Sequence, residues 1–276
     1  MIEIGKFSEL EILREVDFGF YLDGGPLGEL LLPNNSVEGR CHPGDIVNVF
    51  IYLDSEDRVI TTMERPYIEV GEFALLRVIA VESVGAFMDW GLTKDLLVPF
   101  REQKLPLSIG RSYIVRAYLD NKTDRIVAST KLDRFLDKTP ADYEAGEEVD
   151  LLITRRTDLG YNAIINGSHW GVLYENQVFQ RLDVGQEITG YINKMRGDDK
   201  IDLLLEKPGY EKVDGMAGEI LDLLKESGGF LSVTSKSTPE EIYSLFGMSK
   251  KNFKKAVGAL YKQRLVILGD DGIRQA

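Results

Sequence analysis

Short stretches in which apolar and polar residues alternate fill most of the first 205 positions of the chain. Alternation at period two is typical of strands with one buried face. The first group of such stretches, separated by turns rich in glycine and aspartate, predicts strands at residues 9–14, 18–22, 29–32, 47–51 and 59–62. Five short strands in this order favour a small barrel of OB type.

This arrangement occurs three times, which indicates repeated modules. The copies begin at Gly5, Gly71 and Gly146. The second predicts strands at residues 74–81, 86–90, 95–99, 112–118 and 126–129, and the third at 148–155, 161–165, 170–174, 187–193 and 201–205. A chain of 276 residues is therefore expected to hold several small domains, the first three being barrels at residues 1–66, 67–138 and 139–210.

Helical spacing replaces alternation after residue 210. One helix face carries Ala217, Ile220, Leu221 and Leu224. Thr238 and Glu241 bracket a capping box that starts a second helix, and Ser249 caps a third. A short hairpin follows, so residues 211–276 are predicted to form a winged helix-turn-helix. The predicted fold class is mainly β, with three tandem OB barrels and a C-terminal α+β domain.

The net charge of the chain bears on whether it can bind nucleic acid. The value of −12 argues against indiscriminate binding of phosphates, which Lys and Arg drive. Residues 1–66 hold 5 basic and 13 acidic side chains, whereas residues 211–276 hold 10 and 9. For binding to nucleic acid, local basic patches therefore matter more than the net charge of the whole chain.

The cysteine content and the N-terminal residues indicate in which cellular compartment the protein is expected. The single Cys41 excludes an internal disulfide framework and fits a reducing environment. The first residues lack the positive region and apolar core of a secretory signal, and no apolar run is long enough to span a membrane. The expected localisation is cytoplasmic, without a membrane partner.

A short motif connects the modules to a known domain type. In the first two modules it is Phe18-Gly19-Phe20-Tyr21-Leu22 and Val84-Gly85-Ala86-Phe87-Met88, followed later by the pairs Asp54 with Arg58 and Asp120 with Arg125. These runs resemble the S1-type RNA-binding domain, a branch of the OB folds. The chain departs from the S1 pattern where that pattern has His, at Pro33, Pro99 and Tyr174. The third module also has Leu159 and Asn162 in place of the two aromatics, and Asn193 and Lys200 in place of the Asp and Arg pair.

Three such modules followed by a winged helix resemble, over nearly the whole chain, the conserved virulence factor B family of bacterial RNA-binding regulators. The resemblance implies RNA binding and post-transcriptional regulation.

Aromatic residues are the candidates for stacking on bases, a contact that tolerates any base. They are Phe18, Tyr21, Phe87, Tyr161 and Tyr174. The alternative is that some of them fill the small barrels or pack against a neighbouring domain, because strand alternation sends successive side chains to opposite faces.

Basic residues are the candidates for contact with phosphates. The third helix of the last domain carries Lys250, Lys251, Lys254, Lys255 and Lys262. Lysines in the first turns of a helix oppose its macrodipole, so phosphate contact explains them better than solubility does. Further candidates are Arg58, Arg125, Arg155, Arg156, Lys194 and Arg196. For the last four of these, the alternative role is that of isolated surface charges.

Catalytic chemistry is not indicated. The two histidines, His42 and His169, form no recognisable metal-ligand cluster with the single cysteine, and no phosphate loop or nucleophile elbow occurs. We therefore expect a non-enzymatic protein without cofactor or metal, whose partner is single-stranded RNA. Two alternatives stay open: a DNA-binding regulator that uses residues 249–264 as recognition helix, and a protein-interaction scaffold.

Overall fold

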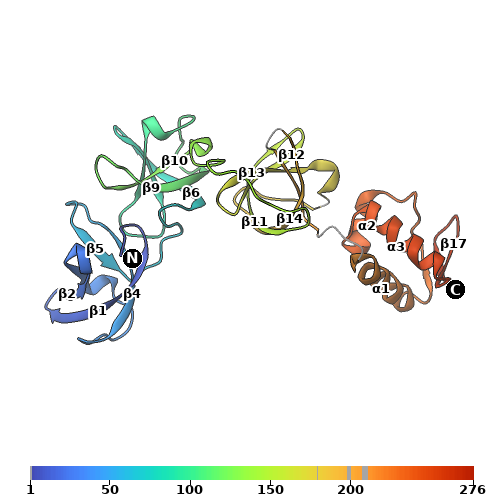
Figure 1. Cartoon of the computed structure of the whole chain (residues 1–276), viewed down its shortest axis with the longest axis horizontal. Coiled ribbons are helices and arrows are strands. Elements are labelled where there is room, and N and C mark those ends of the chain that lie inside the picture. Colours follow the sequence, from blue (N-terminus) through green and yellow to red (C-terminus); the bar gives the residue numbers. More distant parts are fainter. Residues whose placement is uncertain (1, 179, 198–199, 207–210) are drawn as a thin grey trace. The chain divides into compact units, whose positions relative to one another are not determined.

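A computed structural model describes residues 2–178, 180–197, 200–206 and 211–276. Three closed five-stranded barrels are followed by a small helical domain with a three-stranded sheet (Figure 1). The predicted fold class is confirmed. The chain divides into two compact units, Met1–Leu136 with the first two barrels and Asp137–Ala276 with the third barrel and the helical domain.

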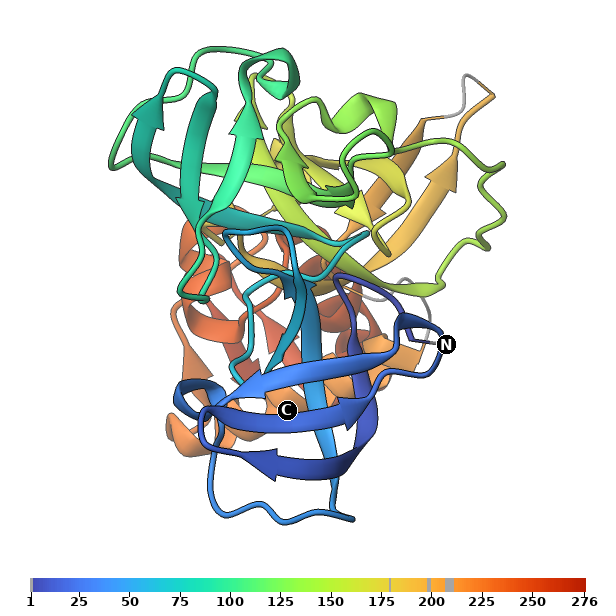
Figure 2. The same ribbon diagram turned by 90° about the vertical axis from the view of Figure 1, so that its left-hand side faces the viewer.

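The first barrel, blue in Figure 2, has the strand order β1-β2-β3-β5-β4. Its strands are β1 Phe7–Val16, β2 Gly19–Asp23, β3 Glu29–Pro33, β4 Ile46–Leu53 and β5 Val59–Thr62. Closure comes from the parallel pairing of β3 with β5, where Leu31 lies opposite Ile60. Alternation places Leu10, Ile12, Leu22 and Leu32 in its core.

The second and third barrels repeat this topology. The second consists of β6 Phe73–Glu82, β7 Gly85–Asp89, β8 Leu96–Pro99, β9 Ser112–Leu119 and β10 Ile126–Ser129. The third consists of β11 Glu148–Thr157, β12 Gly160–Ile165, β13 His169–Tyr174, β14 Glu187–Met195 and β15 Ile201–Leu204. Single 3-10 turns follow β3, β8 and β13, at Asn34–Ser36, Phe100–Glu102 and Glu175–Gln177; two others are Gly25–Leu27 and Leu132–Arg134.

The glycine of the repeated motif is required by close backbone contact. A Cβ at Gly19, Gly85 or Gly160 would lie 2.2, 2.3 or 2.0 Å from the carbonyl oxygen of the neighbouring strand. No side chain can occupy that space, and glycine inside a strand often marks such an approach. Each of these glycines is therefore the first residue of its strand, β2, β7 or β12, at the point where that strand approaches the next one closely.

The first two barrels share a core. Phe50 and Tyr52 of β4 belong to the same buried cluster as Trp90 of the second barrel, and the ring centroids of Phe50 and Trp90 are 5.8 Å apart in an edge-on arrangement. The backbone of Gly5 adds two hydrogen bonds, to Ile51 at 2.7 Å and from Val70 at 3.0 Å. These two barrels consequently form one packed body.

The C-terminal domain has the winged-helix order. Its elements are α1 Glu211–Glu226, β16 Phe230–Leu231, α2 Pro239–Phe246, α3 Lys250–Lys262, β17 Val266–Leu268 and β18 Ile273–Gln275. The predicted capping box of α2 is present, with reciprocal bonds between Thr238 and Glu241. Ser249 caps α3, and Phe253, Ala256, Val257 and Leu260 bury one face of that helix.

Candidate nucleic-acid interface

The first barrel presents an aromatic pair at the turn into β2. Phe18 is 57% exposed, and its ring lies edge-on to Tyr21 with centroids 6.4 Å apart. Phe20, between them, points into the core. Arg14 covers one face of Tyr21, with its guanidinium carbon 4.0 Å from the ring centroid. Phe18 is thus the more accessible surface for a stacked base.

Arg58 is held by carboxylates of its own hairpin. Its Nε donates to Asp54 at 2.7 Å, and its Nη1 lies 3.0 Å from Glu56. The Asp and Arg of the S1 motif therefore pair with each other, as the resemblance implies, and the positive charge of Arg58 is largely compensated.

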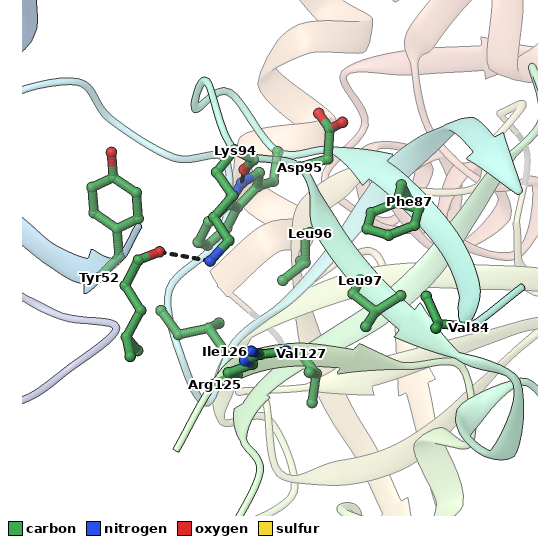
Figure 3. Close-up of a pocket in the computed structure, with 12 residues that line it drawn as sticks. Tyr52, Val84, Phe87, Lys94, Asp95, Leu96, Leu97, Arg125, Ile126 and Val127 are labelled. Atoms are coloured by element: carbon green, nitrogen blue, oxygen red, sulfur yellow. Dashed lines mark hydrogen bonds between the residues drawn. The ribbon is translucent and has the colours of Figure 1, made fainter. Parts of the chain in front are cut away.

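The second barrel carries a pocket of about 230 Å³ beside the first barrel (Figure 3). Tyr52 and Lys94 lie at one end, and Phe87 and Val84 at the other. Phe87 of β7 lines this pocket and is not part of the buried core of the second barrel. Arg125 also lines the pocket, but its guanidinium donates to Asp57 of the first barrel, from Nε at 2.8 Å and from Nη2.

Lys94 of this pocket is held by backbone carbonyl groups of the first barrel. Its ammonium donates to the carbonyl oxygens of Leu53 at 2.9 Å and Asp54 at 2.6 Å. Burial lowers the pKa of Lys94 below its ordinary value, while the neighbouring carboxylate of Asp57 acts in the opposite direction. Burial also raises the pKa of the adjacent Asp95.

In the third barrel one aromatic candidate lies inside. Tyr161 is 6% exposed and belongs to the core, so its ring does not present a face to a base. This corrects the expectation that Tyr161 contacts a ligand. The reason is alternation, because Tyr161 occupies the inward position that Phe20 and Ala86 occupy in the other barrels, while Leu159 takes the exposed position.

The remaining candidates of the third barrel line its outer side. Tyr174 is half-buried and accepts a hydrogen bond from Arg196, whose Nε also donates to Asp202 at 3.0 Å. Arg156 is paired with Glu175 at 2.7 Å. Arg155 and Lys194 are exposed. Of the four candidate cations of this barrel, Arg156 and Arg196 are thus engaged by carboxylates.

The lysines of α3 form the strongest cationic feature. Lys251, Lys254, Lys255 and Lys262 are exposed, Lys250 is half-buried, and none has an ion pair within the part of the chain that the structure describes. The first turn of α3 contains no acidic residue. We call these five residues the α3 lysine stripe.

Three candidate functional residues, Lys94, Arg14 and Tyr52, could not be identified from sequence patterns. Lys94 and Tyr52 gain their significance from parts of the chain far away in sequence: Lys94 binds carbonyls 40 and 41 residues away, and Tyr52 shares a pocket with the second barrel. Arg14 gains its significance from Tyr21, its neighbour across the β1–β2 hairpin. A lysine in the loop between β7 and β8 carries no local signal of such contacts. Among the described residues, no cluster of three or more His, Cys, Asp or Glu side chains suits a metal ion. No helix in the described ranges has the length and apolarity to cross a membrane.

Comparison with known domains agrees with this architecture. Residues 4–64 match the S1 domain, and residues 218–274 match the CvfB-like winged helix domain. The molecule thus consists of an S1-type barrel, two further OB-like barrels of the same topology and a winged helix; S1 and winged-helix domains are nucleic-acid-binding domain types.

Similarity to particular proteins extends over nearly the whole chain. Conserved virulence factor B of Staphylococcus haemolyticus (strain JCSC1435) is 24% identical over 273 residues, which cover 95% of this chain and 91% of that protein. The protein called uncharacterized protein YitL of Bacillus subtilis (strain 168) is 28% identical over 271 residues, covering 94% of this chain and 89% of that protein. The resemblance inferred from the motifs is confirmed.

One solved structure also matches this chain over nearly its whole length. The crystal structure of a multidomain protein with nucleic acid binding domains from Streptococcus pneumoniae TIGR4 covers 99% of this chain and is itself covered to 98%, at 24% identity and a TM-score of 0.41. The fold assignment rests instead on the strand order and on the two domain matches.

Proposed function

We propose that this chain is a non-enzymatic, cytoplasmic RNA-binding protein that acts in post-transcriptional regulation. The observation that carries the proposal is the α3 lysine stripe. Four of its five lysines, Lys250, Lys251, Lys254 and Lys255, lie in the first two turns of α3, near the positive end of the helix dipole, and none of the five has a carboxylate partner among the described residues. Such an arrangement costs stability in the free protein, and the phosphates of a bound strand would relieve it.

The barrels contribute weaker contacts. Phe18 offers an exposed ring to a base, and Tyr174 with Arg196 offers a second, cation-flanked ring. Weak sites on one chain act together, because the first contact raises the effective concentration of the next. The acidic surroundings of the first barrel favour selective over indiscriminate binding.

A DNA-binding regulator is the second candidate, supported by the helix-turn-helix order of α2 and α3. The wing argues against it. Arg274 is engaged there by Asp271 at 2.7 Å, and this bond lowers the pKa of Asp271 to about 2. An arginine held in this way is poorly placed to enter a minor groove. A protein-interaction scaffold is the third candidate, favoured by the acidic first barrel.

The test is the affinity of the full chain for fluorescent single-stranded RNA at several salt concentrations, with duplex DNA as competitor. We expect binding that weakens as salt rises and that duplex DNA displaces poorly. Absence of binding at low salt, or binding insensitive to salt, contradicts the proposal. Preferential displacement by duplex DNA supports the second candidate, and protein partners that persist after ribonuclease treatment support the third.

A further inference from the structure

The sheet of the C-terminal domain ends in an apolar edge strand. β17, Val266–Leu268, lies at one end of the order β16-β18-β17, and within the described part of the chain it pairs with β18 alone (Figure 1). Ile267 is 55% exposed and Leu268 is 46% exposed. The strand contains no charged residue and no proline, which are common means of keeping an edge strand from pairing. β17 is therefore open to a further strand.

The pairing of β17 with β18 shows which backbone groups of β17 are free. Gly269, directly after the strand, donates its N–H to the carbonyl oxygen of Gly272 at 2.8 Å. Successive residues of an antiparallel strand direct their backbone groups alternately to one side and the other, so Ile267 also faces β18. Val266 and Leu268 direct their N–H and C=O groups to the free edge, where no described residue bonds to them.

Two opposite charges flank the strand symmetrically. Arg264 lies three positions before Ile267, and Asp270 lies three positions after it. Both side chains are exposed, and neither has an ion pair within the described ranges. In an antiparallel pair of two β17 strands centred on Ile267, the Arg264 of each copy lies beside the Asp270 of the other. Opposite charges across two strands stabilise their pairing, so this edge is complementary to a second copy of itself.

We propose that β17 pairs with β17 of a second copy of this chain and forms a symmetric dimer. Val266 of one copy lies opposite Leu268 of the other, and the two residues exchange both of their backbone hydrogen bonds. The two Ile267 side chains meet at the twofold axis, and the three-stranded sheet becomes a sheet of six strands. One surface serves both copies, as a twofold axis requires. The proposal goes beyond the proposed function and does not depend on RNA binding.

The small size of the contact determines its expected strength. A hollow of about 410 Å³ lies beside β17, with Tyr261 at the end of α3 and Ile267 in its wall, and a second strand along β17 covers part of this apolar surface. Stable interfaces bury about 1,200–2,000 Å² in total, more than a strand of three residues provides. We therefore expect a dimer that forms and separates with protein concentration, with a dissociation constant on the order of 10 µM.

A disulfide tests the register of the pairing. Residues directly opposite each other at a position without hydrogen bonds have Cα atoms about 4.5 Å apart, and a disulfide needs about 4.4–6.8 Å. Ile267→Cys, made together with Cys41→Ser, should therefore form an intermolecular disulfide under mild oxidation. Leu268→Cys in the same background is the matched control. It lies opposite Val266 and not opposite itself, so it should cross-link at least about tenfold more slowly.

Sedimentation velocity of the full chain without RNA, over roughly 1–200 µM, tests the dimer itself. Ile267→Lys places two like charges at the twofold axis and should give a monomer. Arg264→Asp and Asp270→Arg should each weaken the dimer, and the double variant Arg264→Asp/Asp270→Arg should restore it. Leu245→Lys, at an exposed leucine of α2, should dimerise like the unmodified chain.

Three results would overturn the proposal. A chain that stays monomeric over the whole range leaves the edge of β17 to an extended segment of another protein. A dimer that Ile267→Lys does not disturb lies on another surface of the molecule. Cross-linking of Leu268→Cys as fast as that of Ile267→Cys contradicts the register. Each of these results leaves the proposed RNA binding as it stands, because all three are measured without RNA.

Discussion

Arg125 of the second barrel donates from Nε to Asp57 of the first barrel at 2.8 Å, across 68 residues of sequence. Asp120, the acidic partner that the S1 motif assigns to Arg125, is engaged instead by Arg101 at 2.9 Å. In the second barrel the motif arginine therefore bonds to the first barrel and not to the aspartate of its own hairpin. The first barrel keeps the internal pair of Asp54 with Arg58.

This bridge predicts a pH-dependent contribution to stability. The hydrogen bond from Arg125 holds the pKa of Asp57 below its ordinary value of 3.8. A carboxylate with a depressed folded-state pKa stabilises the fold above the ordinary value, and the contribution disappears as the pH falls through the folded-state pKa. The melting temperature of Asp57→Asn should therefore be lower than that of the unmodified chain near neutral pH and equal to it in strong acid. The control Asp17→Asn, at an exposed turn, should show no such difference; equal melting temperatures near neutral pH would contradict the role of the bridge.

The motif glycines predict a sharp contrast between two substitutions to alanine. Gly85→Ala should lower the free energy of unfolding by about 3 kcal/mol or more, because its Cβ would lie 2.3 Å from the carbonyl oxygen of Val98. Gly258→Ala, in α3 with no atom within 4 Å of the added carbon, should instead raise stability by about 0.5–1 kcal/mol. Urea unfolding measures both values, and a mild effect of Gly85→Ala would refute the close approach.

The α3 lysine stripe predicts a change in salt dependence. For single strands the slope of log K against log salt is about −0.7 per phosphate contact. Lys254→Ala/Lys255→Ala should therefore make the slope shallower by about 1.4 and weaken binding similarly for all RNA sequences. Lys225→Ala is the control, because this lysine lies on α1 and is paired with Asp222 at 3.1 Å. An unchanged slope in the double variant would exclude phosphate contact by these two lysines.

The exposed ring of Phe18 predicts a loss of affinity without a loss of stability. Phe18→Ala should weaken RNA binding by about 1–3 kcal/mol, the usual contribution of one stacked base. Phe100→Ala, at a phenylalanine of similar exposure in the second barrel, should leave affinity unchanged. Fluorescence anisotropy compares the two variants, and equal affinities would remove Phe18 from the interface.

Much of the fold was predictable because its determinants are local. Alternation predicted the fifteen barrel strands, the repeated glycine marked the start of β2, β7 and β12, and the Thr238 capping box located the start of α2. The inward direction of Tyr161 was also available from its register with Phe20 and Ala86. The prediction that Tyr161 contacts a ligand was based on its being aromatic and not on its position in the strand, and for this reason it was wrong.

The sequence by itself determined the barrels, the winged helix and the lysine stripe, because strand faces, helix faces and caps depend on residues a few positions apart. Only the tertiary structure decided the partner of Arg125, the carbonyls that hold Lys94 and the pocket beside Phe87. These features arise where loops of two barrels meet. Their distances depend on how the shared core of Phe50, Tyr52 and Trp90 sets one barrel against the other, and no local pattern in the chain encodes that packing.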